Sequence, residues 1–197
     1  MASTAIGAMA TFAAAAIAAA QQPVPTPIGR GPAYHPAARG PLAAHSFACI
    51  RGDLQRGSRV HLEVFANRRV VIVPAGIGVA GIRAVRFGRI RAARCHARLW
   101  TLDPTGDVHA ATRGLRLGDL FAVWGQPLGR GRLLDFRGRP LVFRNGRRVL
   151  TPASAVELRD RDEIVLEVNG YVPPHRSYRF PPVESGGTIA SGRSKGP

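Results

Sequence analysis

The chain has little lysine and little acid. Of its 28 basic residues Lys195 is the single lysine, and only 12 acidic residues oppose them, which leaves a formal net charge of +16. A GC-rich genome accounts for part of the preference for arginine, but it does not account for the excess over acids. The surface is therefore expected to carry a strong positive field that attracts nucleic acid, anionic lipid or acidic polymers without sequence specificity.

Recognisable catalytic and metal-binding motifs are also lacking. No serine lies in a Gly-x-Ser-x-Gly elbow, and no Cys-x-x-Cys, His-x-His or His-x-x-x-His spacing occurs. One loose set of potential metal ligands is left: His61, His96, His109, Cys49 and Cys95. Although 23 residues are glycine, we expect no phosphate-binding or dinucleotide-binding site. The sequence thus predicts a protein that is not an enzyme, with no cofactor and no metal site.

Cysteine is limited to Cys49 and Cys95. In an oxidising compartment the two form one disulfide, whereas in a reducing compartment they remain two buried thiols. Closing that loop would stabilise the fold by about 4 kcal/mol in the chain-entropy model, less any strain.

The N-terminal part of the sequence resembles an export signal. Residues 1–29 carry no charged side chain, and the alanine-rich run 10–20 has the composition of an apolar signal core with small residues before Gln21. We therefore predict a signal peptide at 1–20, although no Lys or Arg precedes the run; an alanine-rich leader of a cytosolic protein is the alternative. No segment reads as a transmembrane span.

Composition then divides the rest of the chain. A proline- and glycine-rich linker is predicted at 21–48, a folded domain at 49–183 whose end is a proline-rich strap, and a disordered tail at 184–197. Within the domain, alternating apolar residues and turn signals predict hairpins at 60–73, 99–111 and 141–150, followed by a strand at 163–168.

One amphipathic helix is predicted within 117–128, between two blocks of strands. Gly125 and Pro127 are expected to end it. Its apolar face follows the i, i+3, i+4, i+7 spacing and is expected to form the structural core: Leu117, Leu120, Phe121 and Trp124.

The most basic stretch lies between the first two hairpins. Its arginines are Arg83, Arg86, Arg89, Arg91, Arg94 and Arg98. They form either a polyanion-binding patch or a solvated loop or short helix kept soluble by its charges. Phe87 is the single aromatic residue among them, and stacking on single-stranded nucleic acid usually needs more. We favour the solvated segment.

The helix, the hairpin after it and the sequence Val-Glu-Leu-x-Asp-x-Asp-Glu-Ile-Val-Leu at 156–166 resemble the second half of a β-grasp (ubiquitin-like) domain. More specifically, the chain is similar to a family of uncharacterised secreted bacterial proteins. The resemblance rests on 65–67, on 73–79, on Cys95 with 99–109, and on the helix. It implies an α+β, β-grasp-like fold with several hairpins packed on one short helix, and it implies no activity.

The resemblance bears on two further points. Family members carry a cysteine upstream of the first hairpin, as Cys49 does here, which supports a Cys49–Cys95 bridge. Many members have His-Thr-His-Asp where this chain has Trp100-Thr101-Leu102-Asp103. Two histidines in that pattern point to one side of a strand and suit a metal ion. This chain has Trp100 and Leu102 at those positions, so the resemblance does not carry a metal role over to it.

These observations predict a non-catalytic, exported binding or interaction module of the cell envelope that is a monomer. Its expected partner is another protein or an anionic envelope polymer, with nucleic acid less favoured. A first alternative is a basic polyanion- or nucleic-acid-binding protein that uses the arginine stretch 83–98. A second is a periplasmic metal- or cofactor-binding protein.

Overall fold

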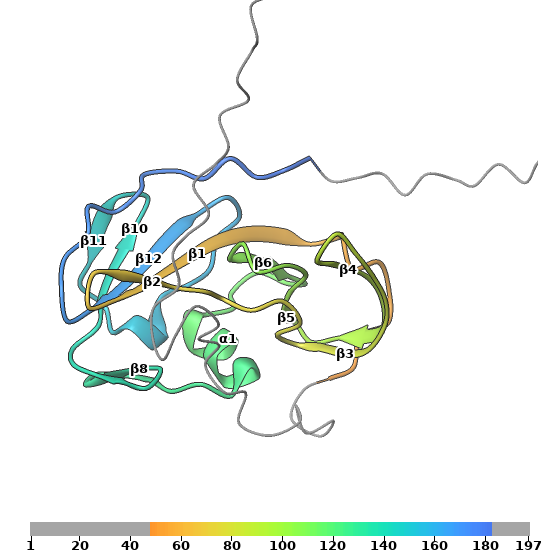
Figure 1. Cartoon of the computed structure of the whole chain (residues 1–197), viewed down its shortest axis with the longest axis horizontal. Helices are drawn as coiled ribbons and strands as arrows, with labels where there is room; N and C mark the ends of the chain where they lie inside the picture. The colour runs from red at the N-terminus through yellow and green to blue at the C-terminus, as the bar shows by residue number, and fades with distance from the viewer. Residues whose placement is uncertain (1–47, 183–197) are drawn as a thin grey trace, which may run out of the picture.

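The structure is a computed structural model that describes residues 48–182. The predicted signal peptide at 1–20, the linker up to residue 47 and the tail at 184–197 lie outside the described residues. Within them the fold is mixed α+β, with mostly strands and one α-helix (Figure 1). The α+β class predicted from the sequence is confirmed.

Most of the strands form one sheet in the order β11-β10-β12-β1-β6-β5, with β2 paired to β1. Its two central strands, β1 and β12, run parallel, and the other pairs are antiparallel. The strands are β1 (Ser58–Ala66), β2 (Arg69–Val71), β5 (Leu99–Thr101), β6 (Asp107–Ala110), β10 (Leu141–Arg144), β11 (Arg147–Val149) and β12 (Glu163–Val168).

The three predicted hairpins and the last strand are confirmed. They correspond to β1–β2, β5–β6, β10–β11 and β12. In the first turn Asn67 and Arg68 both have positive φ (53° and 63°), and in the third Asn145 and Gly146 do (51° and 75°). Such turns match the right-handed twist of the strands that they join.

The arginine-rich stretch is neither a loop nor a short helix. It forms β3 (Val79–Arg86) and β4 (Arg89–His96), which pair as a separate two-stranded sheet. The register shifts between Ile82 and Val85 break the two-residue alternation. The glycines of 76–81 have the G-x-G-x-x-G spacing, but they lead into β3 and not into a helix, so the pyrophosphate-binding helix terminus of a dinucleotide site is missing there.

Smaller elements make two connections in the chain. One set joins the helix to β10, and another joins the β10–β11 hairpin to β12. Residues 128–137 form a minute three-stranded sheet, and a 3₁₀ turn follows β11. These elements are β7 (Leu128–Gly129), β8 (Arg132–Leu133), β9 (Phe136–Arg137) and η1 (Ala153–Ala155).

Helix α1 (Leu117–Trp124) covers one face of the sheet (Figure 1). The four residues of its predicted apolar face are all buried. The Arg116 N–H donates to Asp119 Oδ2 at 2.7 Å and so caps the first turn. Gly125 ends the helix in the left-handed conformation, with φ 70°. The main core lies between this helix and the sheet.

Cys49 and Cys95 form a disulfide that closes a separation of 46 residues, as predicted. It joins the chain before β1 to the end of β4. Among the described residues, none of the helices has both the length and the apolar character needed to cross a membrane.

Candidate metal centre

The two faces of the main sheet differ sharply in chemistry. Along β1, Val60, Leu62 and Val64 enter the core beneath α1. The residues between them, including His61 and Glu63, point to the opposite face because successive side chains of a strand alternate. The second face carries charged groups around His61 and an apolar cluster of Phe65, Phe143 and Val165 farther along; we call it the polar face, and much of it is buried.

The strand register gathers charged groups on this polar face. Arg59 lies opposite His109, and His61 lies between Asp107 on β6 and Glu163 on β12. Residues opposite one another in a sheet share a face. The buried charged and titratable residues of this face are Arg59, His61, Asp107, His109, Glu163 and Glu167.

The segment 171–182 covers the polar face on the side away from α1 (Figure 1). The Tyr178 ring stacks on the His61 ring with centroids 3.6 Å apart. Phe180 packs edge-on against Tyr178, and its ring lies 5.2 Å from the guanidinium carbon of Arg59. The Pro181 carbonyl accepts a 2.6 Å hydrogen bond from Arg59 Nη1. The predicted strap thus shields these groups from water.

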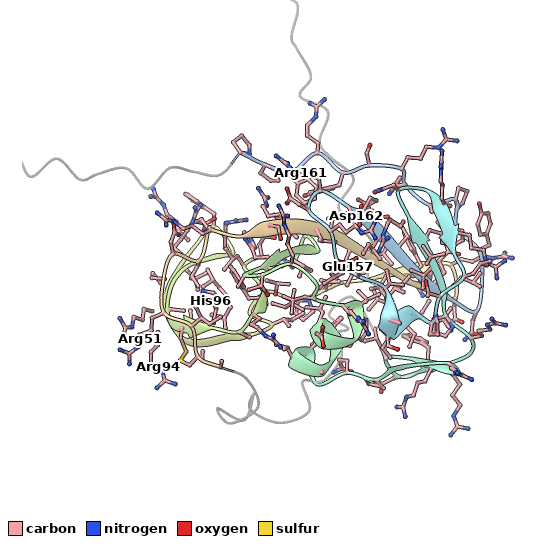
Figure 2. The ribbon with its side chains drawn as sticks, turned by 180° about the vertical axis from the view of Figure 1, so that it is seen from behind. Arg51, Arg94, His96, Glu157, Arg161 and Asp162 are labelled. Atoms are coloured by element: carbon pink, nitrogen blue, oxygen red, sulfur yellow. A yellow bond between two sulfur atoms is a disulfide. The ribbon has the colours of Figure 1, made fainter. Side chains whose placement is uncertain are left out.

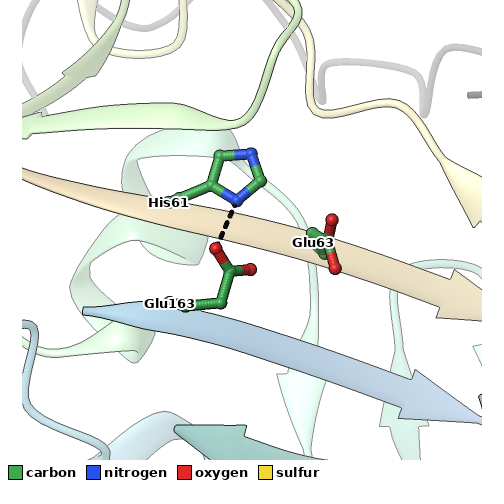
Figure 3. A group of neighbouring side chains, drawn as sticks. All are labelled: His61, Glu63 and Glu163. Atoms are coloured by element: carbon green, nitrogen blue, oxygen red, sulfur yellow. Dashed lines mark hydrogen bonds and ion pairs between the residues drawn. The ribbon is translucent and has the colours of Figure 1, made fainter. Parts of the chain in front are cut away.

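His61 is held by both of its ring nitrogens. Nε2 lies 2.8 Å from the Thr105 carbonyl oxygen, and Nδ1 lies 2.8 Å from Glu163 Oε2. A carbonyl oxygen can only accept, so Nε2 carries a hydrogen and donates it to Thr105. Nδ1 is consequently the nitrogen that faces the carboxylate (Figure 3).

The environment keeps a proton on the His61–Glu163 pair. Burial alone lowers the pKa of His61, but the hydrogen bond and charge of Glu163 and the Thr105 carbonyl outweigh it and raise the pKa above 6.5. Burial raises the pKa of the Glu163 carboxyl, against the opposing effect of His61. A divalent cation between Nδ1 and the carboxylate can take the place of that proton.

Glu63 brings a second carboxylate to the same place. One carboxylate oxygen of Glu63, one of Glu163 and one ring nitrogen of His61 all lie within 4.8 Å of one another (Figure 3). His175, from the covering segment, reaches Glu63 with Nδ1 at 2.8 and 2.9 Å from the two carboxylate oxygens. His175 thus borders the three-residue group through Glu63 and is not part of it.

The donor set fits a divalent transition-metal ion. Zinc bonds to histidine nitrogen and carboxylate oxygen are about 2.0–2.2 Å long, so tetrahedral ligands lie about 3.3–3.6 Å apart. The three ligand atoms lie within 4.8 Å of one another, so they would have to close by about 1 Å on an ion, and Glu63 is the partly exposed member of the group. Metal-binding histidines usually donate their other N–H to a carbonyl, as His61 does to Thr105. Glu163 Oε1 is buried without a hydrogen-bond partner among the described residues, and is free to bind an ion.

Comparisons with protein-family models, curated proteins and solved structures gave no match. The case for a metal site therefore rests on the positions of the chain's own potential ligands.

The other potential ligands named from the sequence do not join this group. His96 and His109 lie against Trp100, with ring centroids 3.9 and 5.3 Å from it, and the two cysteines are bonded to each other. Trp100 and Leu102 are core residues, packed with Leu54, Val79 and Ile90.

The six arginines of 83–98 are dispersed along the β3–β4 hairpin and after it. Arg83, Arg86, Arg94 and Arg98 are exposed. Arg89 is paired with Asp103, and its Nη2 donates to Gln55 at 2.9 Å. Arg91 is partly buried. The stretch therefore presents a partial, not a continuous, positive patch.

Proposed function

We propose that this protein is a non-catalytic, exported binding module whose ligand is a divalent transition-metal ion held by His61, Glu63, Glu163 and His175. The observation that carries the proposal is the convergence of His61 Nδ1 with two carboxylates, fixed by the Nε2–H bond to Thr105. Nitrogen and carboxylate ligands without thiolate favour zinc and its first-row neighbours over calcium or magnesium.

The number of ligands favours binding over catalysis. Catalytic zinc sites keep an open position for water or substrate, whereas sites with four protein ligands are closed. His175, bonded to Glu63 from the covering segment, is the side chain that would complete a fourth position, and Tyr178 stacks over His61. An ion at this place would lie between the sheet and segment 171–182.

We further propose a β-grasp-like fold and membership in the secreted bacterial family that the sequence resembles. The sheet contains the order β2-β1-β12-β10-β11 with β1 and β12 parallel in the middle, and α1 lies on one face. This order supports the β-grasp proposal, with β3–β4 and β5–β6 as insertions. The Cys49–Cys95 disulfide supports an oxidising compartment.

Zinc titration of the untagged, chelator-treated full chain tests the metal proposal. By calorimetry we expect one equivalent to bind, and Glu163→Gln should lower the affinity about 100-fold because the isosteric amide removes a charged ligand. At free zinc of about 100 times Kd, the wild type should gain about 2.7 kcal/mol of stability.

Glu167→Gln is the matched control. Glu167 lies on β12 and on the same face as Glu163, and it is equally buried, but it is not part of the ligand group. It should bind zinc within about twofold of the wild type. Absence of saturable binding, or equal losses in the two variants, would show that the His61–Glu163 and Glu63–His175 pairs only stabilise the fold.

Thiol trapping tests export. If cells of the native organism are lysed in an alkylating reagent, Cys49 and Cys95 should react only after a reductant is added, because disulfides persist in oxidising compartments and are rare in the cytosol. Immediate modification of both cysteines would contradict export.

A further inference from the structure

The β3–β4 hairpin exposes apolar side chains toward its turn. The exposed fractions are 50% for Ile82, 59% for Val85 and 89% for Phe87. Leu150 and Tyr171, which are also exposed, lie elsewhere in the described part of the chain. Ile90, in contrast, packs inward against the core of Trp100 and Leu102. The hairpin thus packs on the core through Ile90 and exposes apolar side chains at its tip.

Phe87 occupies a backbone position that a phenylalanine rarely adopts. Its φ is 50° and that of Gly88 is 72°, as in the primed turns that favour Asn-Gly. A bulky residue at positive φ is strained, and the 89% exposed ring recovers little through burial. Folding stability therefore does not account for an aromatic residue at the tip.

The tip is held in place by its base. The Cys49–Cys95 disulfide fixes the end of β4, and the Ile90 N–H donates to the Leu102 carbonyl at 2.8 Å. Arg89 at the start of β4 is paired with Asp103. An apolar tip on a fixed ribbon loses little conformational entropy when it meets a surface.

Exposed positive charge surrounds the apolar tip. Residues 79–102 contain no acidic residue. Arg83 and Arg86 flank Val85, and the Arg86 guanidinium carbon lies 5.1 Å from the Phe87 ring centroid. Arg51 and Arg94 project at the opposite, disulfide-bearing end of the hairpin (Figure 2).

We infer that the β3–β4 tip docks on anionic phospholipid membranes, with Phe87 and Val85 entering the headgroup–acyl boundary and Arg83 and Arg86 contacting lipid phosphates. Apolar side chains beside arginines are the combination that interfacial binding requires. A nucleic-acid surface would use the charges and the ring, but would give the exposed Val85 and Ile82 no apolar environment. This inference does not depend on the metal proposal.

Vesicle co-sedimentation of the full chain tests the inference. We expect binding to vesicles of phosphatidylcholine with one third phosphatidylglycerol, weak binding to pure phosphatidylcholine, and release by high salt. Phe87→Asn should lower the partition coefficient about tenfold. Its melting temperature should not fall, because asparagine tolerates positive φ. The double variant R83S/R86S should lower partitioning about 30-fold, at about 1 kcal/mol per arginine.

Leu150→Asn and R147S/R148S are matched controls. Leu150 is 85% exposed beside two exposed arginines on another hairpin, so these changes remove the same chemistry elsewhere. Both should bind within about twofold of the wild type. Equal losses in the controls, or equal binding to pure phosphatidylcholine, would overturn the inference. Retention on heparin or single-stranded DNA without vesicle binding would also overturn it, in favour of a soluble polyanion.

Discussion

Replacing Trp124 with alanine is expected to lower the free energy of unfolding by about 3–5 kcal/mol. Trp124 is 3% exposed at the last turn of α1, and its ring lies 5.3 Å from that of Phe121. Truncation leaves a cavity between the helix and the sheet that the surrounding residues fill only in part. Urea denaturation of the wild type and the variant measures the difference.

Trp124→Phe separates packing from hydrogen bonding. The Nε1 atom of Trp124 is buried and has no hydrogen-bond partner in the described part of the chain. Phenylalanine keeps most of the apolar volume and removes an unpaired N–H, so the loss should stay below about 1.5 kcal/mol. A loss below about 1 kcal/mol for Trp124→Ala would contradict the placement of Trp124 in the core.

Local turn chemistry made the three main hairpins predictable. Asn145-Gly146 joins β10 to β11, and Asp103-Pro104-Thr105-Gly106 joins β5 to β6. Each of these turns lies between alternating apolar runs, so the local sequence predicts both the strands and their register. The helix was predictable in the same way, from the spacing of its apolar residues Leu117, Leu120, Phe121 and Trp124.

The β3–β4 hairpin lacks those local signals. Its turn contains Phe87 before Gly88 where Asn or Asp would be expected, and the irregular register near Ala84 disrupts the alternation of apolar residues. Arginines also occupy positions on both strands. Only the pairing of the two strands, which a sequence pattern does not show, makes this segment β structure.

The candidate metal centre depends on long-range topology. His61 and Glu163 are 102 positions apart and meet because β1 and β12 pair in parallel. A weak local signal exists, since Glu163 and Glu167 alternate with Ile164 and Leu166. Such alternation usually means a solvated outer face. Here residues 171–182 cover that face, so the acids are buried, and spacing rules for nearby ligands could not find the site.

Acidification is expected to destabilise the protein through His109. The pKa of His109 is lowered to about 4, mainly by burial; the charge of Asp107 opposes this shift, those of Arg59 and Arg89 add to it, and that of Asp103 opposes it. Both ring nitrogens are buried without a hydrogen-bond partner among the described residues, so the native state accommodates the neutral ring.

The direction in which stability changes with pH follows from proton uptake. In the unfolded chain His109 takes up a proton below pH 6.5, whereas in the folded protein it does so only near pH 4. The unfolded state therefore binds more protons between these values, and stability falls as the pH falls through that window. The loss reaches about 3 kcal/mol at pH 4. His61 has a raised pKa and contributes with the opposite sign, since its stabilisation is lost as pH rises.

Urea denaturation of metal-free protein between pH 7.5 and pH 4 measures this loss. His109→Phe keeps a ring stacked on Trp100 and should flatten the pH dependence by about 3 kcal/mol, and His109→Leu should do the same if the larger ring does not fit. If the free energy of unfolding changes with pH as steeply in His109→Phe and His109→Leu as in the wild type, other groups cause the acid sensitivity. His109 lies opposite Arg59 on the face that also carries His61 and Glu163, so a flattened slope would show that this end of the face keeps a buried imidazole neutral.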